Sequence, residues 1–384
     1  MEYTKLKSIN EYRSENINPM KFPDTIFEMY SVPIYETGHP EYLHGSDIGS
    51  NKVLVQKNDV LLCKINPRIN RVWVVADESE HQNIASSEWI VVRSKAYNPE
   101  FLAWYFRTPK FKKLMTSEVT GIGGSLTRAQ PKAVAEYPIP VIPRQRQDEI
   151  TLILNKSYDI IMLRKRELQS LDELIKARFV ELFGTYPANE KGWATGTIRD
   201  LVTEVRYGSS RKAADGKSGK YPYLRMNNIT YSGELDLSDT KTIDIPDDEL
   251  DKCTVRRGDV LFNRTNSKEL VGKTCVYNRD EMMVLAGFVV RVRLNDKACP
   301  EFVSTFLNTD FSKQMLLNMC KAAIGQANIN AQELQNIGIY IPPKKIQNEF
   351  ISFKSQVDKS KAAVQAALDK AQLLFDSLMQ QYFG

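Results

Sequence analysis

Residues 344–384 have the sequence KKIQNEFISFKSQVDKSKAAVQAALDKAQLLFDSLMQQYFG. The stretch has no Pro, its only Gly is its last residue, and it is rich in Ala, Gln, Lys and Leu, which favour helix. Its apolar residues recur three, four or seven positions apart, the spacing of one helix face: Phe350, Phe353, Val357, Val364, Ala367, Ala371, Leu374 and Leu378. The spacing predicts one helix of about 40 residues, roughly 60 Å long, whose apolar stripe needs an equally long partner.

The same chain contains a second stretch of this kind. Residues 144–184 have the sequence RQRQDEITLILNKSYDIIMLRKRELQSLDELIKARFVELFG. A self-match at a fixed spacing indicates a repeated architecture. Here a shift of 200 residues matches Pro143 with Pro343, Gln147 with Gln347, Glu149 with Glu349, Leu174 with Leu374, and Phe183-Gly184 with Phe383-Gly384.

The segments before the two helical stretches also match each other. Short runs rich in β-branched and aromatic residues predict strands at 52–56, 59–65, 71–75 and 88–93, and Pro99-Glu100 predicts a helix start. Residues 258–264 resemble 58–64, and Pro300-Glu301-Phe302 resembles Pro99-Glu100-Phe101. We therefore expect an α+β fold with two repeated mixed domains at 1–143 and 185–343, separated by long helices at 144–184 and 344–384.

Two arrangements of the long helices are possible. If they pair antiparallel as a coiled-coil-like spacer, both apolar stripes are buried and the domains are related by a pseudo-two-fold axis. Alternatively, each helix packs on its own domain. We favour the antiparallel spacer because a long helix pair buries both stripes. Some apolar residues of the first helix lie outside the stripe that a two-helix contact would bury. We expect them to form a surface that binds partner proteins, and the alternative is that they fill the contact between the helices. They are Ile160, Ile161, Leu171 and Ile175.

The bulk composition leaves most function classes open. The 384 residues are 42% hydrophobic and 26% charged, with a net charge of +5, so a globular protein that can bind nucleic acid is expected. The five cysteines form no Cys-x-x-Cys pair, which favours reduced thiols. No apolar run has the length of a membrane span, so the sequence predicts a cytoplasmic protein.

Motifs for catalysis or metal binding are missing from the sequence. The only histidines are His39, His44 and His81, and no cysteine lies near them, so neither a zinc site nor any other metal site is expected. Gly272-Lys273-Thr274 lacks the glycine that a phosphate-binding loop needs where Ser267 stands. Two repeated enzyme domains should share one acid–base or metal set, and none is repeated.

The repeated feature is a group of polar and basic loops. Arg and Asn side chains can form paired hydrogen bonds with the edges of guanine and adenine, so these loops are candidates for DNA contact. The alternative is that they are solvated turns. The candidates in the first domain are Lys64, Asn66, Arg68, Asn70, Arg71, Ser125, Thr127 and Arg128. Those in the second are Arg206, Tyr207, Ser209, Arg211, Lys212, Arg225, Asn227, Asn228, Arg264, Asn266, Ser267, Lys268, Gln326 and Asn328.

Taken together, the chain resembles the specificity subunits of type I restriction-modification enzymes. The resemblance rests on the two domains, on the Pro-x-x-x-Gln-x-x-apolar entry to each long helix at Pro143 and Pro343, on Gly258-Asp259-Val260-Leu261, and on the ending at 378–384. The first domain has Asn58 in place of Gly258, which is a departure.

The resemblance implies a non-catalytic subunit whose two target-recognition domains each bind half of a split DNA site. It implies that the helices set the gap and dock two modification subunits, which hold S-adenosylmethionine and methylate adenine, and that two ATP-dependent restriction subunits can join. No cofactor is expected in this chain itself. The open alternatives are a protein-interaction scaffold without DNA recognition and a standalone methyltransferase or nuclease.

Overall fold

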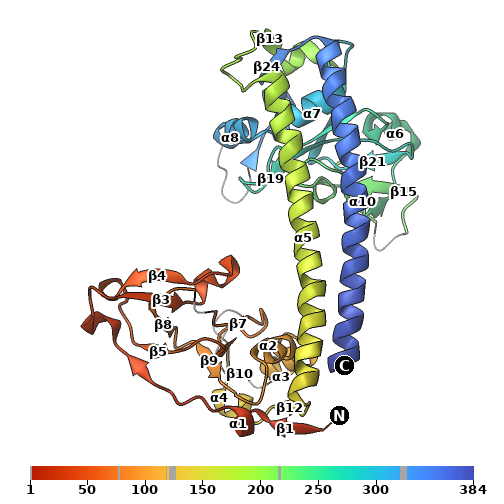
Figure 1. Ribbon diagram of the computed structural model, residues 1–384. Helices are drawn as coiled ribbons and strands as arrows, with labels where there is room; N and C mark the ends of the chain where they lie inside the picture. The colour runs from red at the N-terminus through yellow and green to blue at the C-terminus, as the bar shows by residue number, and fades with distance from the viewer. Residues whose placement is uncertain (1, 77, 118, 121–126, 215–217, 321–326) are drawn as a thin grey trace. The chain divides into compact units, whose positions relative to one another are not determined.

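The computed structural model describes residues 2–76, 78–117, 119–120, 127–214, 218–320 and 327–384. The chain divides into two units, of which unit 1 comprises residues 1–163 and 367–384 and unit 2 comprises residues 164–366. Two long helices, α5 (Arg144–Phe183) and α10 (Lys344–Phe383), each contribute one part to unit 1 and the other part to unit 2 (Figure 1). The predicted pair of long helices and the mixed helix-and-sheet fold are confirmed.

Unit 1 contains a five-stranded sheet in the order β2-β5-β8-β3-β4 and a three-stranded sheet in the order β7-β6-β9. Neighbouring strands pair antiparallel except β3 and β8, which are parallel. Short antiparallel ladders join β1 to β12 and β10 to β11. The strands are β1 (Tyr3–Lys5), β2 (Asn16–Ile17), β3 (Ile26–Tyr30), β4 (Glu41–His44), β5 (Lys52–Leu54), β6 (Val60–Cys63), β7 (Val72–Val74), β8 (Gln82–Ala85), β9 (Trp89–Val92), β10 (Val119–Thr120), β11 (Arg128–Ala129) and β12 (Pro138–Pro140).

The helices of unit 1 pack on the three-stranded sheet. Helix α2 begins where the sequence predicts, because Pro99 occupies its first turn and the Asn98 side chain accepts hydrogen bonds from the backbone N–H groups of Glu100 and Phe101. Six of its residues, from Phe101 to Phe106, are buried. The helices are α1 (Leu6–Ile9), α2 (Pro99–Phe106), α3 (Pro109–Ser117) and α4 (Pro131–Val134), with 3-10 turns η1 (Pro19–Lys21), η2 (Pro33–Thr37) and η3 (Gly45–Asp47).

Unit 2 repeats this plan with two four-stranded sheets, in the orders β14-β22-β18-β20 and β16-β15-β21-β17. Again one pair, β15 and β21, is parallel. Short ladders join β13 to β24 and β19 to β23. The strands are β13 (Ala194–Thr197), β14 (Val202–Tyr207), β15 (Tyr221–Leu224), β16 (Lys241–Ile243), β17 (Thr254–Val255), β18 (Val260–Asn263), β19 (Thr265–Asn266), β20 (Thr274–Val276), β21 (Met283–Leu285), β22 (Val289–Leu294), β23 (Ala327–Asn328) and β24 (Gly338–Ile341).

The helices of unit 2 follow the order seen in unit 1. Helix α7 starts with Pro300 as α2 starts with Pro99, and Thr309 caps the next helix through its side chain. The order of sheets and helices thus recurs in the two units, although the strand numbers of the sheets differ. The helices are α6 (Asp247–Cys253), α7 (Pro300–Asn308), α8 (Asp310–Met319) and α9 (Ala331–Gln335), with 3-10 turns η4 (Ile198–Leu201) and η5 (Met226–Asn228).

The two long helices pair antiparallel within each unit. In unit 1, the guanidinium of Arg146 lies over the Tyr382 ring, and further along the pair the rings of Tyr158 and Phe375 are 6.0 Å apart. In unit 2, Arg178 bonds Glu349 at 2.6 Å, and Lys361 bonds Asp172 at 2.6 Å. In both units the α5 number rises as the α10 number falls, which confirms the antiparallel arrangement.

Each long helix also enters the core of the domain beside it, so the two arrangements considered from the sequence coexist. In unit 1, Phe383 packs on Phe101 with ring centroids 5.4 Å apart, and in unit 2 Phe183 packs on Phe302 at 4.9 Å. The expectation that Ile161 and Ile175 form partner surface is wrong, because both are buried in these cores. Ile160 is 51% exposed.

The apolar stripe of α10 differs from the prediction at one position. Leu374 is exposed, and Phe375 takes the buried place beside Trp104 and Tyr158. A step of four residues from Ala371 keeps Phe375 on the buried face where a step of three had been expected. The five cysteines are free, as predicted.

Candidate nucleic-acid interface

Some of the candidate residues of unit 2 gather at one end of the sheet β14-β22-β18-β20. Tyr207 is the last residue of β14 and Arg264 follows the last residue of β18. Both Tyr207 and Phe262 pair with Val290 near the start of β22, so the two strand ends lie at the same edge. Phe288 immediately precedes β22 at this edge. We call Tyr207, Arg264, Asn266, Phe288 and Asn328 the second edge cluster.

Arg264 is held by a neighbouring aromatic ring. Its Cζ lies 4.9 Å from the centroid of the Tyr207 ring, a cation–π contact. The Tyr207 hydroxyl accepts a hydrogen bond of 3.0 Å from the backbone N–H of Ala331, which fixes the ring. The Nε of Arg264 is buried and donates to none of the residues the structure describes. The Arg264 side chain is thus oriented by its contact with the Tyr207 ring.

The short β19–β23 ladder brings two predicted loops together. Asn266 pairs with Ala327, and Thr265 pairs with Asn328 and donates its hydroxyl to the Asn328 side-chain oxygen at 3.1 Å. The loop beyond Asn266 carries Ser267 and Lys268, which are both exposed. Amide, hydroxyl and ammonium groups from distant parts of the sequence therefore share one edge.

Unit 1 has the same arrangement at the end of the sheet β7-β6-β9. Lys64 follows β6, Asn66 donates its backbone N–H to the Thr127 carbonyl at 2.8 Å, and Ile65 bridges to Arg128. Arg128 donates two hydrogen bonds of 3.2 Å to Glu88, and these raise its pKa above the ordinary value. We call Lys64, Asn66, Glu88, Thr127 and Arg128 the first edge cluster.

Three further candidates lie in the turn after β6. Arg68 is exposed, and Arg71 is 4.0 Å from Glu36. Asn66 and Asn70 adopt positive φ angles of 48° and 55°, and the Asn70 amide donates to the Phe106 carbonyl at 3.1 Å. Asn is one of the few residues that adopts this conformation readily. Asn70 therefore has a structural role in shaping this turn.

The remaining candidates of unit 2 lie outside the second edge cluster. Several of their side chains are engaged with acids: Arg206 with Glu204, Arg211 with Glu249, and Arg225 with Asp239. Asn228 is buried and donates to the Asp236 carbonyl at 2.8 Å, and Ser209 is buried beside the sheet. Asn227 and Lys212 are exposed. Ser125 and Gln326 lie outside the described residues.

Two members of the edge clusters were missed from the sequence. Glu88 falls within the predicted strand 88–93, yet Glu88 and Phe288 each precede the observed strand by one residue. The signal that identifies them is the shift of 200 residues, which places them at the same position of the repeat. Neither side chain is a typical candidate for base contact when considered alone.

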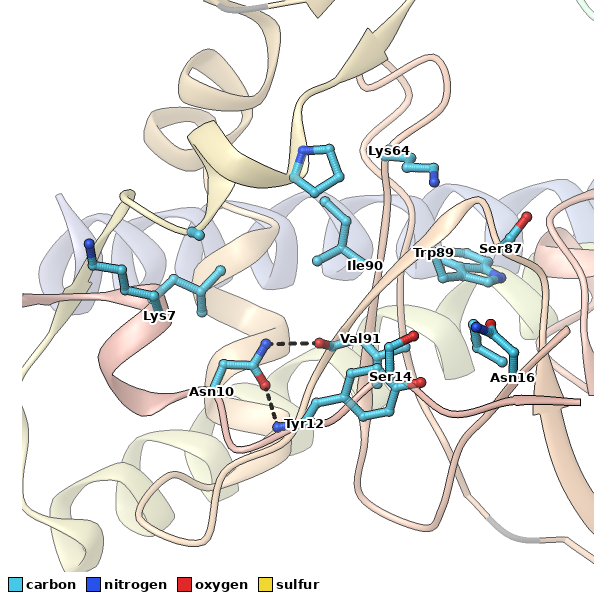
Figure 2. Close-up of a pocket in the computed structure, with 14 residues that line it drawn as sticks. Lys7, Asn10, Tyr12, Ser14, Asn16, Lys64, Ser87, Trp89, Ile90 and Val91 are labelled. Atoms are coloured by element: carbon cyan, nitrogen blue, oxygen red, sulfur yellow. Dashed lines mark hydrogen bonds between the residues drawn. The ribbon is translucent and has the colours of Figure 1, made fainter.

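A pocket of about 500 Å³ adjoins the first edge cluster. Figure 2 shows Lys64, Ser87 and Asn16 toward one end of this pocket and Lys7 and Asn10 toward the other. The Asn10 side chain is engaged in hydrogen bonds within the domain, because it donates to the Val91 carbonyl and accepts from the N–H groups of Tyr12 and Arg93. Lys64 is therefore the group that links this pocket to the edge cluster.

Neither metal-binding nor membrane-spanning elements appear in the part of the chain that the structure describes. No group of three or more His, Cys, Asp or Glu residues there could hold a metal ion. No helix among these residues is long and apolar enough to cross a membrane.

Comparison with known proteins identifies the domain that contains the second edge cluster. Residues 190–371, which include the second edge cluster, match the family model described as type I restriction modification DNA specificity domain. Residues 190–371 thus form a type I restriction modification DNA specificity domain, and the chain is similar to type I specificity subunits. The match covers unit 2 from just after α5 and extends into α10. It therefore contains the sheet, the edge cluster and much of the long helix.

Similar proteins extend the match beyond the second domain. The chain is 21% identical over 302 residues to the type I restriction enzyme EcoKI specificity subunit of Escherichia coli, a match that covers 74% of this chain and 64% of that protein. It is 24% identical over 196 residues to the EcoEI specificity subunit of Escherichia coli, covering 49% and 33%. The chain thus spans less than two thirds of the length of each of these relatives.

Two solved structures show the same fold along the whole chain. One is a chain from a study of complex assembly and conformational transition of the type I R-M system, with a TM-score of 0.58 and 18% identity, covering 100% of this chain and 97% of that one. The other is the S subunit of the type I restriction-modification system from M. genitalium, with a TM-score of 0.58 and 10% identity, covering 100% and 96%.

Proposed function

We propose that this chain is the DNA-specificity subunit of a type I restriction-modification system and that each edge cluster contacts one half of a split DNA site. The observation that carries the proposal is a repeated backbone frame with different side chains. Lys64 donates a backbone N–H to the carbonyl of Glu88, the residue before β9, and Arg264 donates one to the carbonyl of Phe288, the residue before β22, both at 3.0 Å. Ala129 and Ile329 each donate an N–H, at 2.9 Å, to the carbonyls of Lys64 and Arg264. Two domains that recognise two different sequences need this combination of constant frame and variable side chains.

The side chains of the clusters suit DNA contact. Basic groups such as Lys64, Arg264 and Lys268 can bind phosphates, which gives affinity, and Arg264, Asn266 and Asn328 can form hydrogen bonds with base edges, which gives specificity. The recognition domains in this proposal are residues 1–143 and 185–343. The net charge of +5 is compatible with a polyanionic partner.

The long helices would act as the spacer between the half-sites and as the docking surface for partners. Both helices belong partly to unit 1 and partly to unit 2. Apolar side chains on the helices are left exposed, including Leu152, Leu163 and Leu174 on α5 and Leu373 and Leu374 on α10. Exposed apolar groups on paired helices suit contact with other proteins.

The partners in this proposal are two modification subunits that hold S-adenosylmethionine and methylate adenine, with two restriction subunits in the complete complex. The chain itself is non-catalytic and holds no cofactor. A cytoplasmic location follows from the same role.

The salt dependence of DNA binding tests the proposal. The full chain, bound to its modification subunits, is titrated against a duplex that carries the recognition site at several salt concentrations. Because bound cations are released from DNA when a protein neutralises phosphates, log K should fall linearly with log salt, with a slope of about −0.9 per phosphate contacted. Affinity for peptides with no salt-dependent DNA binding would instead favour the interaction scaffold. Thermal stabilisation of the isolated chain by S-adenosylmethionine or a metal would favour an enzyme.

A further inference from the structure

Positions 88 and 288 are the point at which the two edge clusters differ most in chemistry. The carbonyl of Glu88 accepts the N–H of Lys64, and that of Phe288 accepts the N–H of Arg264, both at 3.0 Å. The backbone therefore holds both residues in the same place. In unit 1 this place carries a carboxylate that accepts two hydrogen bonds from Arg128, and in unit 2 it carries an apolar ring.

Phe288 is left in solvent at the centre of the second edge cluster. Its side chain is 52% exposed, and Tyr207, which stacks on the neighbouring Arg264, is 45% exposed. An exposed phenylalanine carries little information when it stands alone on a surface. Here, however, Phe288 is bonded through its backbone carbonyl to Arg264, so a DNA duplex that meets Arg264 also meets Phe288.

One group on the base edges of DNA has the apolar character that complements the Phe288 side chain. On the major-groove edge of the base pairs, the 5-methyl group of thymine is the apolar group, and the other positions offer hydrogen-bond donors and acceptors. We infer that Phe288 recognises a thymine in the second half-site through contact with its 5-methyl group. The inference rests on the proposed function, because it requires the second edge cluster to face DNA.

The equivalent position in unit 1 indicates why this contact belongs to one half-site. Glu88 cannot make the same apolar contact, and its carboxylate is occupied by Arg128. The two units hold this position with the same backbone hydrogen bonds, so the presence of Phe in one and Glu in the other changes the preferred base while the fold stays the same. The thymine should therefore lie in the half-site contacted by unit 2.

The test replaces thymine by uracil, which removes only the methyl group. The complex of the full chain with its modification subunits is titrated against duplexes in which each thymine of the second half-site is replaced singly. For wild type we expect one position at which uracil weakens binding about fourfold, the effect of losing about 0.8 kcal/mol for one buried methyl group. For Phe288→Ala, thymine and uracil at that position should bind equally.

Two variants control for folding and for general loss of affinity. Phe288→Leu keeps an apolar side chain and should retain most of the thymine preference. Phe22→Ala removes a phenylalanine of unit 1 that is 49% exposed, and should leave the preference unchanged.

The outcomes separate the inference from the proposed function. If wild type binds the site but shows no uracil-sensitive position, or if Phe288→Ala keeps the sensitivity, the inference is overturned while DNA recognition stands. A half-site without thymine overturns it as well, and so does uniform weakening of Phe288→Ala on every sequence. If the wild-type complex binds no DNA, the proposed function itself fails.

Discussion

The side-chain oxygen of Gln347 accepts a hydrogen bond of 2.7 Å from the backbone N–H of Cys299, the residue before α7. The Gln347 amide donates to the carbonyls of Lys297 and Pro342 at 2.9 and 2.8 Å. In unit 1, Gln147 accepts from the N–H of Asn98 at 2.8 Å and donates to the Ile142 carbonyl at 2.7 Å. The glutamine of the Pro-x-x-x-Gln motif thus fastens the start of each long helix to its domain.

Replacement of these glutamines should destabilise the fold. Both side chains are buried, so alanine leaves backbone groups without partners, and each unpaired buried group costs about 1–3 kcal/mol. We expect Gln347→Ala to lower the free energy of unfolding by about 2–4 kcal/mol and Gln147→Ala by slightly less, as measured in urea. Gln145→Ala, which changes an exposed residue of the same helix, should stay within about 0.5 kcal/mol of wild type. Equal effects at 145 and 147 would contradict this role.

A buried ion pair also recurs in the two units. Arg93 donates two hydrogen bonds of 2.7 Å to the fully buried Asp59 carboxylate, and Arg293 donates to Asp259 at 2.9 Å. Asp59→Ala removes these charge-assisted hydrogen bonds and should lower the free energy of unfolding by about 1.5–3 kcal/mol. Asp259→Ala should cost less, because Arg293 also bonds Glu204 at 2.8 Å.

A double-mutant cycle separates the interaction energy between Asp59 and Arg93 from the energy lost when either side chain no longer packs. Asp59→Ala with Arg93→Ala should be less destabilising than the sum of the single changes, with a coupling of at least about 1 kcal/mol. The exposed pair of Arg257 and Asp280 serves as the comparison and should show less than about 1 kcal/mol. Additive effects at Asp59 and Arg93 would show that the pair is not coupled.

Lys313 should make stability rise with pH in the alkaline range. Burial, reinforced by the charge of Lys176, lowers its pKa from 10.5 to about 8. Between these two pH values the unfolded chain binds more protons than the folded chain, so the free energy of unfolding increases as pH rises. Denaturation in urea from pH 7 to pH 10 should show wild type gaining stability relative to Lys313→Met. A constant difference across this range would show that the pKa of Lys313 is not lowered.

Arg264→Ala should affect one half-site only. If Arg264 contacts a base, its loss should relax the preference at one position of the second half-site by about 1–3 kcal/mol and leave the first half-site unchanged. Binding measured on single-base variants of the site tests this. Arg257→Ala, a change near the other end of β18, should leave the preference intact. Equal weakening on every sequence would assign Arg264 to a phosphate.

Matched deletions in the long helices should change the gap of the recognised site. Removal of residues 163–169 from α5 and 364–370 from α10 takes out two turns from each helix and preserves the buried face. At 1.5 Å per residue, the change is about 10 Å, or roughly three base pairs. Mapping of methylated sites should give unchanged half-sites with a shorter gap. Altered half-sites with the original gap would rule out the spacer role.

Much of this fold follows from local patterns in the sequence. The long helices, the strand around Val260 and the helix start at Pro99 depend on spacing, propensity and capping, which act over a few residues. The prediction that Leu374 belongs to the buried stripe of α10 is wrong, because the neighbouring Phe375 is the residue that packs on Trp104. Ile161 is buried because the domain covers a second side of the helix, which helix spacing alone does not indicate.

The candidate site was predictable by region and less so by residue. Asn70 and Asn228 are polar loop residues whose amides bond distant carbonyls, and the sequence does not distinguish such roles from exposed ones. Phe288 was missed because an apolar residue beside a strand is counted with the strand. Its role depends on the backbone bond to Arg264, which only the comparison of the two units makes evident.

Methylation mapping tests the central claim most directly. This chain is expressed together with the modification subunit of its own system, and that subunit is also expressed alone, in cells whose DNA is then sequenced by a method that detects modified adenine. The account predicts adenine methylation at one split motif only when this chain is present, and a change confined to one half of that motif with Arg264→Ala. The absence of any new methylated motif, despite formation of a soluble complex, would contradict the account.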